Sequence, residues 1–211
     1  MFDKTFKLHF SIFLIWLFTI SGIFGILSDE YSDWFLSMTP LNLLLTFIIL
    51  IINIEELKPN VAIALAIPFF TGFITEALGV NFGLIFGTYA YGENLGLKVF
   101  GVPLMICVNW ALLTAATADV AKYISKNRFL SALIGAALMT GLDMLLEVSA
   151  PRFDFWEFDG GVVPLQNYVG WLVTAFVAHL GYQLLKPKTN KLISWHILIS
   201  IAVFFAVFLF F

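Results

Sequence analysis

Charged side chains are scarce in this sequence. Asp, Glu, Lys and Arg together make up 12% of the 211 residues, whereas hydrophobic residues make up 61%. Soluble domains contain roughly 25% charged and 45–50% apolar residues. The composition therefore predicts that most of the surface of the chain faces lipid rather than water.

Cysteine is almost absent, and the residues that commonly bind metals do not form a motif. Cys107 is the single cysteine, so a disulfide within the chain and a zinc site built from clustered cysteines are excluded. The three histidines lie at positions 9, 179 and 196, without metal-ligand spacing. The net charge of −3 and the lack of a basic patch predict no nucleic-acid partner. We therefore expect neither a metal nor a nucleotide cofactor.

Long apolar runs recur along the chain. About 17–25 apolar residues are needed to cross the hydrocarbon core of a bilayer. We therefore expect an all-α, polytopic membrane bundle of about seven transmembrane helices, with residues 1–211 forming one integral membrane domain. The first run is longer than the core of a signal peptide, so we interpret it as a retained helix. The seven segments are Leu8–Leu27, Met38–Ile54, Val61–Leu78, Val102–Ala121, Phe129–Val148, Tyr168–Leu185 and Ile193–Phe211.

The basic residues predict the orientation of these segments. If the N-terminus is cytoplasmic, nine of the 11 basic residues fall on the inner side, and only Lys98 and Arg152 fall outside. Cytoplasmic loops carry such an excess of Lys and Arg. We expect a multi-pass protein of the cytoplasmic (inner) membrane. The inner basic residues are Lys4, Lys7, Lys58, Lys122, Lys126, Arg128, Lys186, Lys188 and Lys191.

Two of the expected outer loops, residues 79–101 and 149–167, are long and rich in glycine and aromatic residues. Long loops in compact folds are often lids or binding segments. We expect both to approach the membrane interface, where Trp and Tyr are enriched. The part between Phe153 and Phe158 is predicted to cover the outer end of the bundle.

Three acids within the apolar segments are candidate catalytic residues. Asp143 and Glu147 are four residues apart and so share one helix face, and Glu76 lies near the outer end of the third segment. An ionisable group inside a span is costly and usually functional. Two neighbouring acids cannot both stay charged cheaply without a cation. The alternative interpretation is a structural polar network between helices.

The position of other polar residues along the apolar segments predicts their depth in the membrane. Asn109 lies about two turns into the fourth segment, and Asn167 begins the sixth, so both should meet the three acids in the outer leaflet. Asp119 lies near the inner end of the fourth segment, where we expect it to pair with Lys122 instead. We interpret His9 and His179 as structural histidines.

A dry pocket of acids and aromatic rings suits acid catalysis on an apolar substrate. A carboxyl group shielded from water stays protonated near neutral pH and can protonate an alkene. Aromatic faces stabilise the resulting tertiary carbocation by about 2 kcal/mol or more when desolvated. A second carboxylate can then position water or remove a proton. Hydration, isomerisation and cyclisation all fit this chemistry.

Three ordered motifs resemble the CruF family of carotenoid 1,2-hydratases. The run YAYGENLGLKVFGVPLMICVNW, from Tyr89 to Trp110, is similar to its Y-x-Y-G…LG…FGVPL…W signature. The run ALMTGLDMLLEVSAPRFDFWEF resembles its D-x-x-x-E-P…A…FW segment, and VPLQNYVGW resembles its IP…NY-x-GW segment. This sequence differs in that its proline, Pro151, comes four residues after Glu147. The resemblance runs from about Gly72 to Trp171.

The resemblance implies a reaction and a set of partners. The family adds water to the terminal 1,2 double bond of an acyclic carotenoid ψ-end, giving a tertiary alcohol without a redox cofactor. Its substrates include lycopene-like, γ-carotene-like and bisanhydrobacterioruberin carotenoids. The expected partners are an apolar carotenoid, membrane lipid, water as co-substrate and other enzymes of the carotenoid pathway.

We expect Asp143 or Glu147 to donate the proton, with Glu76 as the next candidate for donor or base; the choice stays open. Asn109 and Asn167 would hold the water. The remaining predicted substrate-binding residues are Tyr89, Tyr91, Trp110, Asp154, Trp156 and Trp171.

Two alternatives share these residues. A carotenoid cyclase or isomerase would use the same acid chemistry. A proton-coupled transporter would also place acids in its spans. A relay should reach both faces of the membrane, however, and these acids gather in the outer half, so transport ranks lower.

Overall fold

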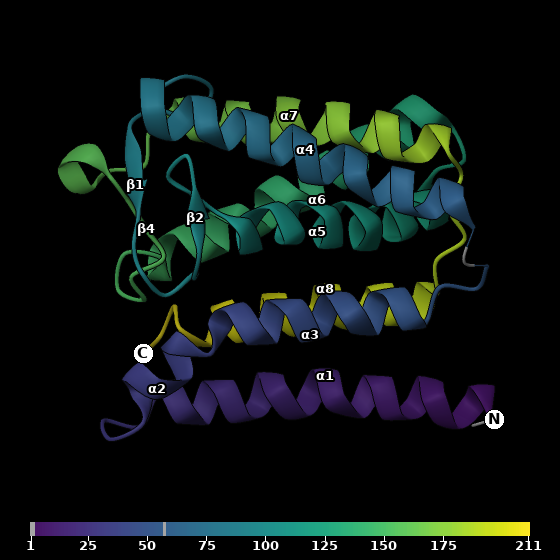
Figure 1. The fold of residues 1–211 in the computed structure, drawn as a ribbon, viewed down its shortest axis with the longest axis horizontal. Helices are drawn as coiled ribbons and strands as arrows, with labels where there is room; N and C mark the ends of the chain where they lie inside the picture. Colours follow the sequence, from purple (N-terminus) through teal and green to yellow (C-terminus); the bar gives the residue numbers. More distant parts are fainter. Residues whose placement is uncertain (1–2, 57) are drawn as a thin grey trace.

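The computed structural model describes residues 3–56 and 58–211. Within these ranges the chain forms eight α-helices, and the long ones lie side by side along one axis (Figure 1). The helices are α1 (Lys4–Ile26), α2 (Ser32–Ser37), α3 (Thr39–Ile52), α4 (Pro59–Phe82), α5 (Leu104–Ile124), α6 (Arg128–Ser149), α7 (Leu165–Leu184) and α8 (Lys191–Val207). Short strands and one 3-10 turn are β1 (Tyr89–Tyr91), β2 (Lys98–Val99), β3 (Val102–Pro103), β4 (Trp156–Phe158) and η1 (Asp159–Gly161).

The helices agree with an all-α membrane protein. One helix falls within or across each of the seven apolar segments, and α2 is an additional short helix. In the described part of the chain, α1, α4, α5 and α6 are long and apolar enough to cross a membrane. The apolar helices α3 and α8 are shorter, with 14 and 17 residues. Seven spans and a cytoplasmic N-terminus therefore stay predictions.

Helix α5 forms the centre of the bundle. Fifteen of its 21 residues are buried, and it packs against α3, α4, α6, α7 and α8. Alanines at positions 111, 115, 116 and 118 let neighbouring backbones approach closely. In Figure 1, α4 and α7 lie on one side of α5, whereas α3, α8 and finally α1 lie on the other. Helix α5 therefore contacts both the α4–α7 side and the α3–α8 side of the bundle.

Helix α4 is longer than its apolar pattern predicts. The expected segment ends at Leu78, but the helix continues to Phe82 and ends at Gly83, whose φ of +65° is left-handed. Glycine favours this conformation at a helix C-terminus because it has no Cβ. Glu76 therefore lies nearly two turns from the helix end rather than one.

The two long loops pair with each other at one end of the bundle. Strands β1 and β4 are antiparallel, with Tyr89 opposite Phe158 and Tyr91 opposite Trp156. Alternate side chains of a strand point to opposite faces. These four aromatic side chains point toward the helices, whereas Glu157 is exposed on the other face. The paired loops close this end of the bundle (Figure 1).

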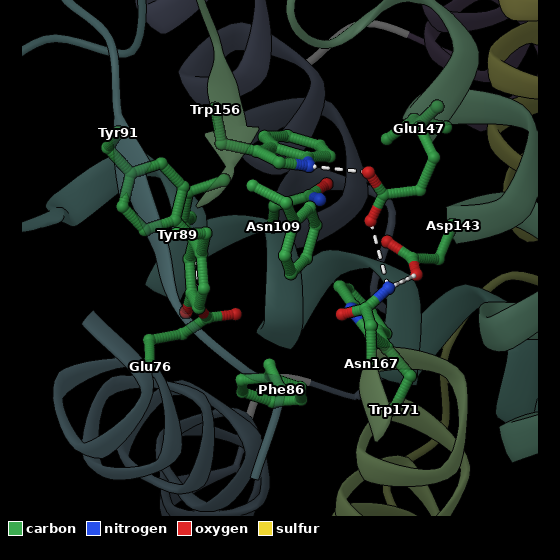
Figure 2. Close-up of a pocket in the computed structure, with 13 residues that line it drawn as sticks. Glu76, Phe86, Tyr89, Tyr91, Asn109, Asp143, Glu147, Trp156, Asn167 and Trp171 are labelled. Carbon is green, nitrogen blue, oxygen red and sulfur yellow. Dashed lines mark hydrogen bonds between the residues drawn. The ribbon is translucent and has the colours of Figure 1, made fainter. Parts of the chain in front are cut away.

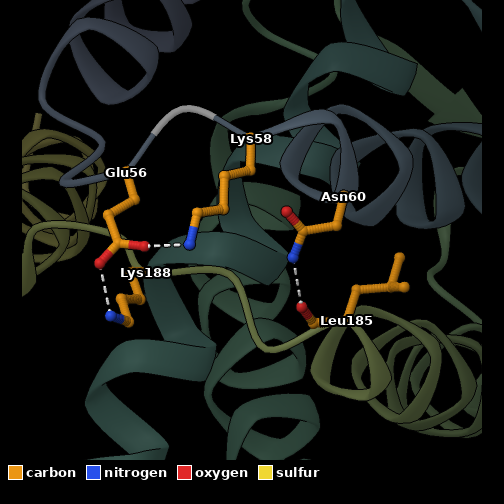
Figure 3. Close-up of polar contacts among 5 residues, drawn as sticks. All are labelled: Glu56, Lys58, Asn60, Leu185 and Lys188. Atoms are coloured by element: carbon orange, nitrogen blue, oxygen red, sulfur yellow. Dashed lines mark hydrogen bonds and ion pairs between the residues drawn. The ribbon is translucent and has the colours of Figure 1, made fainter.

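An ion-pair cluster fastens the opposite end. Glu56, which follows α3, lies 2.5 Å from the amines of both Lys58 and Lys188 (Figure 3). Hydrogen bonds from Lys188 and Lys58 lower the pKa of Glu56 to about 2. Asn60 donates a 2.8 Å hydrogen bond to the carbonyl of Leu185 beside them. These contacts join the α3–α4 and α7–α8 connections, although exposed ion pairs are weak.

Gly170 of α7 marks a close approach between a helix and a loop. A Cβ at this position would lie 2.4 Å from the carbonyl oxygen of Ile85, a backbone atom that cannot rotate away. We expect Gly170→Ala to lower the free energy of unfolding by about 1–3 kcal/mol, as overpacking usually does. Thermal unfolding in detergent measures the change. Gly141→Ala is the matched control, because a Cβ at Gly141 meets nothing within 4 Å; equal melting temperatures for the two variants would contradict the prediction.

Candidate active site

A small cavity lies beneath the paired strands β1 and β4 and between helices α4, α5, α6 and α7. Its volume is about 30 Å³. A polar cavity needs roughly 10–15 Å³ to hold one water, so one or two waters fit. Figure 2 shows the side chains that surround it. They are Glu76, Phe86, Tyr89, Tyr91, Ile106, Asn109, Asp143, Leu146, Glu147, Trp156, Phe158, Asn167 and Trp171.

Asp143 and Glu147 share one hydrogen-bond donor. They lie on successive turns of α6, and Asn167, in the first turn of α7, faces both. Its amide nitrogen donates to Oδ2 of Asp143 and to Oε1 of Glu147, each at 2.9 Å (Figure 2). The indole of Trp156 donates to Oε2 of Glu147 at 2.9 Å. Both oxygens of Glu147 are therefore occupied by N–H donors.

Asp143 differs from Glu147 in that one of its carboxyl oxygens has no hydrogen-bond partner in the described part of the chain. Its Oδ1 is buried and has no hydrogen-bond partner among the described residues, although Asp143 lines the cavity. Buried polar atoms nearly always have a partner, either protein or water. This oxygen is therefore available to a water or a substrate in the cavity.

Glu76 is held by three donors on the opposite side of the cavity. The hydroxyls of Tyr89 and Tyr91 both donate to its Oε2, the latter at 2.7 Å, and the indole of Trp110 donates to its Oε1 at 2.9 Å. Burial is the main effect that raises the pKa of Tyr89 and of Tyr91, and the nearby Glu76 carboxyl is the second. Both hydroxyls thus stay protonated and remain donors.

Aromatic rings enclose the space between the acids. Trp171 stacks on Trp110 with ring centroids 4.4 Å apart, and Phe86 lies 6.2 Å from Trp171. Tyr89 contacts Phe158 at 5.2 Å. Among the described residues that line the cavity, none is Lys, Arg or His. The site combines three carboxyl groups with aromatic faces, an arrangement suited to a positively charged intermediate.

Nine of the eleven predicted site residues line the cavity. Trp110 lies just behind the wall and reaches it through Glu76 and Trp171. Asp154 does not line it: the side chain is exposed and accepts a 2.8 Å hydrogen bond from the backbone N–H of Glu93. The structure thus corrects the placement of Asp154, which joins the two loops. The nine are Glu76, Tyr89, Tyr91, Asn109, Asp143, Glu147, Trp156, Asn167 and Trp171.

Four apolar lining residues were not predicted from the sequence. Ile106 lies three residues before Asn109, and Leu146 three residues after Asp143, so helical spacing could have identified both. Phe158 is two residues beyond Trp156 on one strand face. Phe86 had no such signal, because Ile85 beside it has a φ of +69° that no pattern predicts.

The inner polar residues form separate contacts. Asp119 accepts a 2.6 Å hydrogen bond from the hydroxyl of Ser194, and no ion pair joins it to Lys122 in the described part of the chain. Asp119 and Lys122 therefore do not form the expected direct ion pair, and the amine of Lys122 lies over the ring of Tyr182 at 5.7 Å. His179 is fully buried, with its ring nitrogens bonded at 2.9 and 2.7 Å, as a structural histidine should be.

Comparison with known proteins identifies the family of this chain. The profile of a family described as "Carotenoid biosynthesis protein" matches residues 37–211, which include the whole cavity. Bisanhydrobacterioruberin hydratase of Haloarcula japonica is 32% identical over 118 residues, covering 50% of this chain and 39% of that protein. The matched region thus spans well under half the length of that relative. No solved structure matches the chain.

Proposed function

Because the chain belongs to the carotenoid biosynthesis protein family, we propose that it hydrates the terminal double bond of an acyclic carotenoid. The observation that carries the proposal is the pair Asp143 and Glu147 beside a cavity with room for one or two waters. The name of the Haloarcula japonica relative, a hydratase, supports the same reaction. The water-sized space favours hydration over cyclisation, which needs no water.

Asp143 is the proposed proton donor. Two adjacent carboxyl groups with no cation beside them are expected to share one negative charge. N–H donors stabilise the ionised form, and Glu147 receives two of them whereas Asp143 receives one. The charge therefore belongs on Glu147, and the proton belongs on Asp143, whose Oδ1 is unpartnered.

The proposed reaction has two steps. The Oδ1–H bond of Asp143 breaks as the alkene π electrons form a new C–H bond at C2, which leaves a tertiary cation at C1. The oxygen of water then bonds to C1, and one of its protons passes to Glu147. Transfer of that proton to Asp143, one helical turn away, restores the starting state. The net change is the addition of one water.

The opposite wall of the cavity stabilises the cation. Glu76, held by three donors, presents its carboxyl group there. The rings of Tyr89, Phe86 and Trp171 add cation–π stabilisation of about 2 kcal/mol or more in a desolvated site. The amide of Asn109 also lines the cavity and can orient the attacking water.

Pigment analysis tests the proposed function. The protein is produced in a bacterium that makes lycopene and contains no hydratase, and the pigments are measured by mass spectrometry. We expect products heavier by one water per modified end, and none from the empty vector. Products of unchanged mass with altered absorption would instead indicate cyclisation or isomerisation. Unaltered pigments together with proton flux in liposomes would indicate transport.

A further inference from the structure

A second, larger cavity adjoins the small cavity that contains Asp143, Glu147 and Glu76, which we call the acid cavity. It lies between α1, α3, α5 and α8 and has a volume of about 110 Å³. Four side chains line both spaces and form the wall between them: Ile106, Asn109, Leu146 and Trp156. We call the larger space the apolar chamber. A group in the chamber is therefore separated from Asp143 and Glu147 by one layer of side chains.

Most of the wall of the chamber is apolar. Three of its hydroxyl-bearing residues, Thr19, Thr46 and Ser200, donate their hydroxyls to carbonyls of their own helices at 2.8–2.9 Å. Their hydrogen-bond donors are thus occupied, and their hydrocarbon parts are left to contact an occupant. The other lining residues are mostly Leu, Ile and Phe. A hydrocarbon chain suits this space better than a polar ligand.

The chamber continues to the outside of the bundle. A groove of about 380 Å³ lies between α1, α2 and α3. It shares Thr39, Asn42 and Phe204 with the chamber. Side chains of α1 and α3 that flank this region, such as Phe24 and Leu41, are exposed as expected for a surface facing lipid. Groove, chamber and acid cavity therefore form a series in which each neighbouring pair shares a wall.

Two larger grooves on the helix surface lack this connection. One lies between α6 and α7 and the other between α4 and α7, with volumes of about 620 and 580 Å³. Neither shares a lining residue with the acid cavity. Size alone therefore does not identify the route to the acids.

We propose that the groove and the chamber bind the hydrocarbon chain of the substrate, which enters from the lipid between α1 and α3 with its end group first. The inference rests on the proposed function for the identity of the chain. The end group passes the wall at Asn109 and Trp156 to reach Asp143, while the polyene stays in the chamber and the groove. Trp156 is then a positioning residue, because it lines both spaces and holds Glu147 through its indole N–H at 2.9 Å.

A size series at Thr46 tests the route. Thr46 of α3 is half-buried and lines the chamber. We expect Thr46→Trp to lower kcat/KM for lycopene about tenfold or more, equivalent to about 1.4 kcal/mol. Thr46→Val, which keeps the size, should lower the rate much less than Thr46→Trp does. Thr71→Trp is the matched control, because Thr71 is also half-buried but lines the α4–α7 groove.

Binding is measured beside activity so that the two proposals can fail separately. The lycopene retained by each purified variant is quantified by absorbance, and its folding is checked by thermal unfolding. Loss of both retention and rate in folded Thr46→Trp, with Thr71→Trp unaffected, supports the route. Retention without hydration in the wild type, still lost in Thr46→Trp, supports the route and refutes the hydratase. Equal retention and rates in the two tryptophan variants, or a loss confined to Thr71→Trp, overturns the route.

Discussion

Replacing Asp143 by Asn is expected to lower the rate of carotenoid hydration by about 10²–10⁴-fold, the usual contribution of a general acid. The amide keeps the size of the side chain and can still accept the hydrogen bond from Asn167, but it has no acidic proton to give to the alkene. The rate is measured from product formation with lycopene in detergent or lipid nanodiscs. Thermal unfolding should stay close to that of the wild type.

Asp119→Asn is the control for this variant. Asp119 is also a buried acid, but it bonds Ser194 and does not line the cavity. Its replacement should leave the hydration rate within about twofold, since it takes no part in proton transfer. Activity that survives in Asp143→Asn would show that the proton comes from Glu147 or Glu76.

Glu147→Gln should separate protonation from water capture. This variant keeps the proposed donor Asp143 but loses the base that accepts a proton from the attacking water. In D₂O the cation should still form and then lose a proton again, which returns deuterium-labelled or isomerised alkene. We expect the yield of alcohol to fall by about 10²-fold or more while deuterium accumulates in the recovered carotenoid. Mass spectrometry measures both quantities in one sample.

Two comparisons make the deuterium experiment decisive. Asp143→Asn should give neither alcohol nor label, because no cation forms. Glu157→Gln, on the exposed face of β4, should behave as the wild type. If Glu147→Gln lost the alcohol and the label together while Asp143→Asn kept the label, the donor and base roles would have to be exchanged.

The acid pair was predictable from the sequence because a spacing of four residues fixes one helix face. Depth along the apolar segments also brought Asn109 and Asn167 to the right level. The partners of Glu76 were not predictable, since two of its three donors depend on how β1 folds back over α4 and the third comes from the packing of α5 against α4. Asp154 was misplaced because it lies in the turn before β4, with a positive φ of 53°, and local composition does not encode that turn.

The end of α4 shows why the loop boundary was wrong. The sequence predicts a glycine-rich loop that starts at Gly79, but Gly79 lies within helix α4 and is buried. A Cβ there would come within 2.8 Å of the Tyr89 hydroxyl. The missing side chain lets Tyr89 lie against the helix and reach Glu76. This glycine serves a tertiary contact, and only the three-dimensional arrangement distinguishes that use from a turn.

The hydrogen bonds of the site divide it into two parts that are each local in sequence. All three donors to Glu76 lie within 34 residues of it, on β1 and α5. Both donors to Glu147 lie within 20 residues, on β4 and α7. The α4–α5 hairpin can thus shield Glu76 before α6 and α7 have been synthesised, and the α6–α7 hairpin carries its own donors to Glu147. The β1–β4 pairing then joins the two hairpins. The cavity that contains the acids therefore closes only after α7 has been synthesised.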